Sequence, residues 1–100
     1  MIIDLTDIEY LENYNKKYVF DNEQSSLTLI SFKKGNERSL HVDEKDEVSI
    51  IVEGKAEVTI GTEKYVLCEK QMIVMPAKTP HGLRALEDTK ILLLRPKHIH

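Results

Sequence analysis

From Lys17 onward, short apolar segments alternate with polar turns. The apolar segments are residues 18–20, 27–32, 40–42, 48–52, 56–60, 65–67, 72–75, 82–86 and 91–94. Turn-forming pairs such as Lys34-Gly35 and Gly61-Thr62 separate them. Many short strands joined by short turns predict an all-β domain, either a sandwich or a small antiparallel β-barrel of the jelly-roll kind.

Two of these segments indicate which faces the strands bury. In residues 56–60, Ala56, Val58 and Ile60 alternate with polar residues, as in a strand with one buried face. Residues 48–52 are apolar at nearly every position, as in a strand that is covered on both faces. A minimal barrel covers only the inner face, and an exposed apolar face favours association. We therefore expect a second copy of the chain to cover the outer face, giving a homodimer.

Residues 1–16 are predicted to form an N-terminal extension. Within it, Thr6 and Glu9 have the spacing of a capping box, which predicts one or two helical turns through Glu12. The barrel is expected to occupy residues 17–97 and a C-terminal tail residues 98–100. The spacing of His98 and His100 in that tail would suit a metal ion, but a frayed end is the better interpretation.

Length and charge exclude several functional classes. A chain of 100 residues forms one domain, and its net charge is −3 with no long run of lysine and arginine. A nucleic-acid partner is therefore not expected. No apolar run is long enough to span a bilayer, and the N-terminus lacks the pattern of a signal peptide. We therefore expect no membrane partner. Cys68 is the single cysteine, so no internal disulfide is possible, and we expect a cytoplasmic protein.

The residues that carry chemistry fall on strands that can meet inside the barrel. His41 and Asp43 are two apart and point to the same side of a strand. Glu47 follows a polar turn and opens the next strand, so it can face His41 across an antiparallel pair. His81 opens a later strand and enters the barrel if the face that it shares with Leu83 points inward. Two imidazoles and two carboxylates would then converge.

These residues and the glycines around them resemble the two signature motifs of the cupin family. The matching positions are Gly35, His41, Glu47, Gly54, Pro76 and His81. The chain departs from the family pattern at four positions: Asp43 replaces a histidine, Lys70 and Lys78 replace glycines, and Ala85 replaces an asparagine. The resemblance implies a cupin jelly roll, in which the first motif supplies two histidines and a glutamate and the second motif supplies a third histidine.

The resemblance also implies a metal site. The set His41, Asp43, Glu47 and His81 suits one divalent ion such as Mn, Fe, Ni or Zn, because imidazole and carboxylate both bind such ions. Asp43 is shorter than histidine and could act through water or accept a hydrogen bond from a ligand of the ion. Small cupins imply an oxygenase, isomerase or lyase that acts on a small molecule. The alternative is a metal-free barrel that binds a small ligand or serves as a structural or partner-binding domain. The residues leave open whether the chain is an enzyme.

Three cations near these motifs have more than one interpretation. Lys78 lies in a turn at a position where a positive φ would strain it. It is either a solvated turn residue, a cation that recruits an anionic substrate, or an ammonium that neutralises Asp43 and Glu47 in place of a metal. If strand alternation holds, Arg84 and Arg95 should lie outside the barrel.

Overall fold

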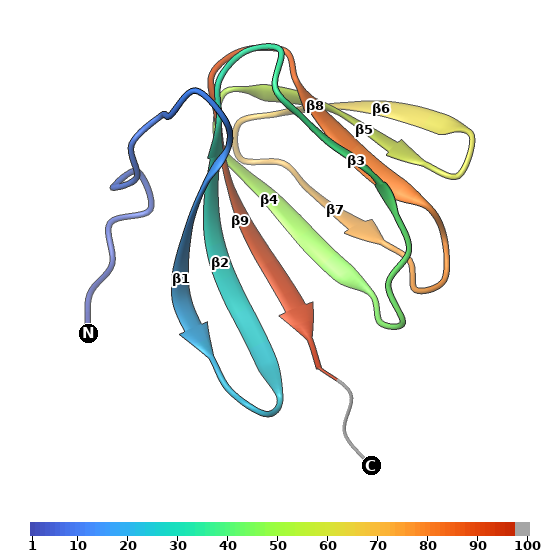
Figure 1. The fold of residues 1–100 in the computed structure, drawn as a ribbon, viewed down its shortest axis with the longest axis horizontal. Helices are drawn as coiled ribbons and strands as arrows, with labels where there is room; N and C mark the ends of the chain where they lie inside the picture. The colour runs from blue at the N-terminus through green and yellow to red at the C-terminus, as the bar shows by residue number, and fades with distance from the viewer. Residues whose placement is uncertain (98–100) are drawn as a thin grey trace.

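The computed structural model describes residues 1–97 and consists of nine antiparallel strands in two sheets. The strands are β1 (Asn15–Asp21), β2 (Ser25–Phe32), β3 (Glu37–His41), β4 (Glu47–Glu53), β5 (Lys55–Ile60), β6 (Glu63–Cys68), β7 (Met72–Met75), β8 (His81–Ala85) and β9 (Thr89–Pro96). The five-stranded sheet has the order β1-β2-β9-β4-β7 and the four-stranded sheet the order β3-β8-β5-β6 (Figure 1). The prediction of an antiparallel β-barrel or jelly roll is confirmed.

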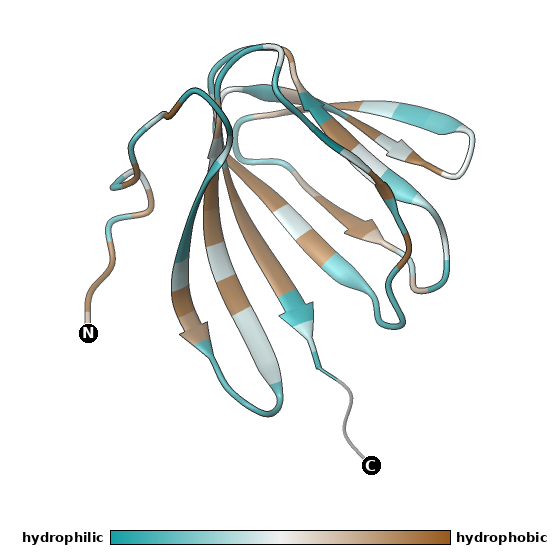
Figure 2. Ribbon diagram, viewed as in Figure 1, coloured by the Kyte–Doolittle hydropathy of each residue, from teal (hydrophilic) through white to brown (hydrophobic). Residues whose placement is uncertain are grey.

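The core lies between the two sheets, where the inner faces of the strands meet. Hydrophobic and hydrophilic positions alternate along several strands (Figure 2). On β5, for example, Ala56 and Val58 are buried and the residues between and beside them are less so. The buried cluster comprises Ile30, Phe32, Ile51, Ala56, Val58, Leu67, Met75, Ala85, Ile91 and Leu93. Because the side-chain period of a strand is two, this cluster also defines which residues of each strand face inward.

The prediction of a helical turn in the N-terminal extension is wrong, since no helix occurs within residues 1–97. The Thr6 hydroxyl does not cap a helix. Instead, the Thr6 backbone N–H and hydroxyl both donate to the Asp4 carboxylate, at 2.9 and 2.8 Å. This local bonding offers the backbone an alternative to helix.

Contacts with the outer face of the barrel hold the extension in an irregular path. Ile8 is buried, the Ser31 hydroxyl donates to the carbonyl of Glu9 at 2.6 Å, and the Tyr10 hydroxyl donates to Glu53 at 2.7 Å. Tertiary contacts therefore replace the helical hydrogen bonds that the capping pattern predicted.

No helix in the described part of the chain is long and apolar enough to cross a membrane. The predicted tail with His98 and His100 lies outside the described residues.

Candidate metal centre

A bulge in β3 brings His41 into the barrel. On β8 the paired residues Leu83 and His81 are two apart, whereas their partners Arg38 and His41 on β3 are three apart, so β3 contains one extra residue. Both Arg38 and His41 consequently face inward, which regular alternation would forbid. Gly82 makes room for the bulge, because a Cβ at this position would lie 2.8 Å from the carbonyl oxygen of Arg38.

Glu47 and His81 are the two fully buried members of the site. Glu47 is the first residue of β4 and is 0% exposed, and His81 is the first residue of β8 and is 1% exposed. His81 Nε2 lies 3.2 Å from Glu47 Oε1. Leu83 and Ala85 follow His81 on the same face and pack into the core, so the apolar floor expected below His81 is present.

Hydrogen bonds to the backbone orient both imidazoles in the same way. His41 Nδ1 lies 3.1 Å from the carbonyl oxygen of Ser39, and His81 Nδ1 lies 3.0 Å from that of Thr79. Since a carbonyl only accepts, each Nδ1 must carry the proton. Each Nε2 then has a free lone pair when the ring is neutral, which is the arrangement that metal-binding histidines use.

The four predicted ligands do converge. Nε2 of both histidines and one carboxylate oxygen from each of Asp43 and Glu47 lie within 4.8 Å of one another. His41 Nε2 is 3.2 Å from Asp43 Oδ2 and 3.7 Å from Glu47 Oε1, and His81 Nε2 is 3.5 Å from Asp43 Oδ2. Among residues 1–97, no other group of three or more such side chains comes together.

This spacing fits a divalent ion. Ligands about 2.1 Å from a common ion are separated by about 3.0 Å at octahedral angles and about 3.4 Å at tetrahedral angles. The nitrogen–oxygen separations of 3.2 to 3.7 Å lie around the tetrahedral value and above the octahedral one. Two of the converging atoms, His41 Nε2 and Asp43 Oδ2, are also buried without a hydrogen-bond partner among the described residues. Such orphaned atoms are rare unless a water or an ion satisfies them.

Burial keeps the His41 ring in its neutral form. Desolvation lowers the pKa of His41 from its usual 6.5, and the nearby charge of Arg38 lowers the pKa further. The hydrogen bond to Ser39 and the Asp43 carboxylate act in the opposite direction but do not prevail. At neutral pH the Nε2 lone pair of His41 is therefore available to a metal.

Arg95 also reaches this site, and the prediction that it lies outside the barrel is wrong. Its Nη2 atom is 3.4 Å from both carboxylate oxygens of Glu47 and 3.6 Å from Asp43 Oδ2. On β9, Arg95 shares the inward face with Ile91 and Leu93. The two-residue spacing from Ile91 to Leu93 to Arg95 could have predicted this position. However, residues 91–94 are apolar at every position, so the sequence does not indicate which face of the strand points inward.

The other cations are placed as follows. Arg84 is exposed on β8, as predicted. Lys78 adopts a φ of +61°, so it occupies the strained turn position that was expected. Its backbone N–H donates to the carbonyl of Asp43 at 2.7 Å, its side chain is exposed, and it forms no ion pair within the described residues. Arg95, not Lys78, is therefore the cation beside the two carboxylates.

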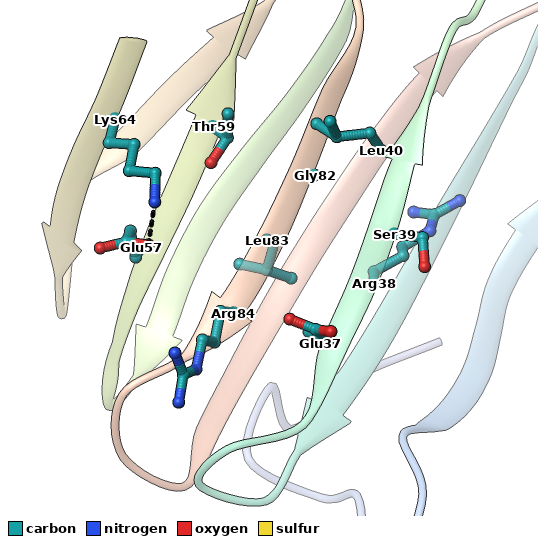
Figure 3. Close-up of a pocket in the computed structure, with 10 residues that line it drawn as sticks. All are labelled: Glu37, Arg38, Ser39, Leu40, Glu57, Thr59, Lys64, Gly82, Leu83 and Arg84. Carbon is teal, nitrogen blue, oxygen red and sulfur yellow. Dashed lines mark ion pairs between the residues drawn. The ribbon is translucent and has the colours of Figure 1, made fainter. Parts of the chain in front are cut away.

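A broad hollow of about 510 Å³ lies elsewhere, against the four-stranded sheet (Figure 3). Outward-facing charges surround it, among them Glu57 and Lys64, whose carboxylate and ammonium groups lie 3.7 Å apart. Among the described residues it contains no cluster of metal-ligating side chains, so we assign no chemistry to it.

With this geometry established, comparison with known proteins identifies the class. Residues 28–94 match the family model described as "Cupin domain". The chain therefore belongs to the cupin family, as its two motifs indicated, and the matched region includes all four residues of the candidate metal centre.

Solved structures support the same assignment. A conserved protein of unknown function from Streptococcus pyogenes, SPY1581, is 32% identical and has a TM-score of 0.91, over 100% of this chain and 90% of that one. The protein TT1209 from Thermus thermophilus is 29% identical, with a TM-score of 0.87 over 97% of this chain and 98% of that one. KdgF from a Halomonas species is 28% identical, with a TM-score of 0.78 over 92% of this chain and 84% of that one. A search of curated proteins found no match.

Proposed function

We propose that the chain binds one divalent transition-metal ion through His41, Asp43, Glu47 and His81 and uses it to act on a small molecule. The observation that carries this proposal is the convergence of four donor atoms at ligand-like spacing, two of them buried and otherwise unpartnered. Mn, Fe, Ni and Zn all suit a set of two imidazoles and two carboxylates. Such an ion would act as a Lewis acid on a substrate oxygen, in an oxygenase, isomerase or lyase reaction.

The two carboxylates have different environments and therefore suit different roles. Glu47 is fully buried and contacts both histidines, so it would be a permanent ligand that neutralises part of the ion's charge. The side chain of Asp43 is 24% exposed. Its Oδ2 atom could serve either as the fourth ligand or as the group that accepts a proton from a substrate.

A metal-free ligand-binding barrel is the second candidate, and Arg95 is the observation that favours it. A guanidinium beside two carboxylates could neutralise them without an ion. However, charge-assisted hydrogen bonds are normally about 2.7–2.9 Å long. The contacts of Arg95 with Glu47, at 3.4 Å, are much longer. Arg95 also leaves His41 Nε2 and Asp43 Oδ2 unsatisfied, which makes a metal the better interpretation.

Metal content and metal-dependent stability distinguish the two candidates. The protein is purified from defined medium, its metal content is measured, and its melting temperature is recorded with and without Mn, Fe, Ni or Zn. An ion that binds the folded state raises the melting temperature by mass action. We expect about one ion per chain for wild type and a loss of both signals in His81→Ala.

A matched control removes the two histidines of the tail. His98→Ala/His100→Ala eliminates the other spacing in the sequence that could bind a metal and should retain full metal content. If this double variant loses the metal while His81→Ala keeps it, the assignment to the barrel is refuted.

We also infer that the protein forms a homodimer through the outer face of the five-stranded sheet. One register-paired row on this face is apolar on every strand, namely Phe20, Leu27, Leu94, Val48 and Val74. Because the row carries no charge, two copies related by a twofold axis can bring it together without like-charge repulsion. Such a row is otherwise a liability in water.

Light scattering at micromolar concentration tests the dimer. Val74→Lys places a charge in the apolar row and should shift the mass to that of a monomer. Val66→Lys is the matched control, since Val66 is 55% exposed on β6 of the other sheet and Val74 is 50% exposed on β7. A monomeric wild type, or a dimer that survives Val74→Lys, would contradict the proposal.

A further inference from the structure

We propose that Arg38 and Arg95 form an anion subsite beside the metal centre and that this subsite binds the carboxylate of a small organic acid. The inference deepens the proposed function, on which it rests, by assigning a class of substrate. Neither arginine belongs to the predicted ligand set. The register of β3 and β9 turns both side chains toward the inside of the barrel.

A small cavity of about 30 Å³ lies at the barrel opening where these two arginines meet. The remaining residues that line it are Lys16, Tyr18, Ser26, Thr28, Ile30 and Leu93. Three cations and three hydroxyl groups therefore surround this space, and no carboxylate among the described residues lines it. The donors come from strands of both sheets, so the folded barrel itself builds the subsite.

The two guanidinium groups are incompletely paired within the described residues. Arg38 is half-buried on the inner side of β3 and has no hydrogen-bond or ion-pair partner among residues 1–97. Arg95 makes only the long contacts with Glu47 and Asp43, and its Nε atom is buried without a partner. Burial and the neighbouring charge of Arg95 both lower the pKa of Arg38, and the Asp43 carboxylate opposes them without prevailing.

Metal binding would sharpen this imbalance. Asp43 and Glu47 together neutralise the charge of a divalent ion. Once they do so, the positive charges of Arg38 and Arg95 have no carboxylate nearby, among the described residues, to balance them. An incoming carboxylate would restore neutrality, and the rest of the acid would lie close to the metal centre, because Arg95 lines the cavity and also contacts the two ligand carboxylates.

The size of the cavity favours a carboxylate over a phosphate. A water molecule needs roughly 10–15 Å³ of such space, so the cavity accommodates about two. The two oxygens of a planar carboxylate fit this space, whereas the four oxygens of phosphate exceed it. Arginine also matches a carboxylate through two parallel hydrogen bonds. The rest of the acid would extend past Lys16 and Tyr18 toward solvent or toward the metal.

Calorimetric titration with matched probes tests the subsite. The full-length protein is stripped of metal, dialysed free of chelator, and titrated with succinate, with its uncharged isostere succinamide, and with inorganic phosphate. We expect succinate to bind and succinamide not to bind. Arg38→Gln should weaken succinate binding roughly tenfold or more, as expected for the loss of a charge-assisted hydrogen bond.

Arg84→Gln is the matched control. It removes the same charge from the neighbouring strand, and Figure 3 shows the Arg84 side chain pointing away from that of Arg38. Arg84 is exposed and does not line the cavity. Its replacement should leave the dissociation constant of succinate unchanged. An equal effect of both variants would show that succinate responds only to the net charge of the protein, and this would overturn the proposal.

Other outcomes separate the subsite from the metal centre. Equal binding of succinate and succinamide, or an unchanged affinity in Arg38→Gln, overturns the anion subsite even if the metal binds. Phosphate binding as tight as succinate overturns the assignment to a carboxylate. Conversely, failure to bind any ion refutes the proposed function, while Arg38-dependent succinate binding in the metal-free protein would still establish the subsite. Metal content of Arg38→Gln should equal that of wild type.

Discussion

Arg95 and the metal should compete for the same two carboxylates, which makes Arg95→Gln the most informative single substitution. In the metal-free protein this guanidinium is the only cation within ion-pair distance of Glu47 among the described residues, apart from the histidines if they were protonated. Removing it leaves a fully buried carboxylate without a formal positive charge nearby. The metal-free protein should therefore lose stability.

The structure sets the size of this loss. At 3.4 Å, one pair of unit charges interacts by about 1 kcal/mol in water and by about 5 kcal/mol at an effective dielectric constant of about 20. The Arg95 side chain is 36% exposed, so solvent screens the contact and the lower part of this range applies. We expect a loss of about 1–2 kcal/mol in the free energy of unfolding. For a domain of this size, that corresponds to a fall of about 5–15 °C in melting temperature.

The same substitution should strengthen metal binding. A divalent ion neutralises Asp43 and Glu47 itself, so the metal-bound protein should lose little stability when Arg95 is replaced. The thermodynamic cycle then requires the affinity for the ion to rise by the difference, about 5- to 30-fold. This result would be the opposite of the usual expectation, which is that replacing a residue beside a metal site lowers the affinity for the metal.

Two measurements check the cycle. Thermal unfolding of the metal-free protein gives the loss of stability, and a competition titration with a chromogenic chelator gives the affinity for Zn. Arg84→Gln is the control and should change stability by less than about 0.5 kcal/mol. An unchanged melting temperature together with unchanged or weaker Zn binding in Arg95→Gln would refute the electrostatic reasoning.

Substitutions at four other positions test separate parts of the structure. Asp43→His restores the histidine found at this point of the family motif and should tighten binding of Zn or Ni, measured by the same chelator competition; weaker binding would show that position 43 does not reach the ion. Lys78→Gly removes a side chain at a φ of +61° and should raise the free energy of unfolding by roughly 0.5–1 kcal/mol in urea titrations, despite the greater freedom of the unfolded chain. Because the folded-state pKa of His41 lies below its unfolded value of 6.5, the unfolded state binds more protons as the pH falls through this window. The metal-free protein should therefore lose stability below about pH 6.5, and His41→Gln should flatten this dependence; a slope that does not change would contradict it. Gly82→Ala introduces a Cβ 2.8 Å from the backbone oxygen of Arg38 and should cost about 1–3 kcal/mol, together with a loss of metal affinity as β3 shifts, whereas wild-type stability would show that the bulge can relax.

The strand pattern was largely readable from the sequence because it depends on local properties. Each predicted apolar segment overlaps one of the nine observed strands, since a half-buried strand needs apolar residues at every second position whatever its partner is. The four residues of the candidate metal centre were also readable. Asp43 follows His41, the last residue of β3, by two positions, and Glu47 and His81 stand at the first positions of β4 and β8. The expected antiparallel pairing of the strands that carry His41 and Glu47 was wrong, because β3 and β4 lie in different sheets.

The errors occurred where long-range contacts overrode a local rule. The capping pattern at Thr6 predicted a helix, but Asp4 captures the Thr6 hydroxyl and the barrel surface binds the residues that follow. Propensity describes an isolated segment, and a segment this short gains more from docking than from a single helical turn.

The two arginines show most clearly what only the tertiary structure decided. Residues 91–94 are apolar on both faces, so the pairing of β9 between β2 and β4 determines that Ile91 and Leu93 point inward and that Arg95 follows them. Arg38 faces inward only because β3 contains an extra residue opposite Gly82. A bulge moves every residue beyond it to the opposite face of the strand. The alternation of residues in the sequence does not show where a bulge lies. The sequence by itself therefore determined the strands and the four metal-ligand candidates, whereas strand pairing decided which charges surround them.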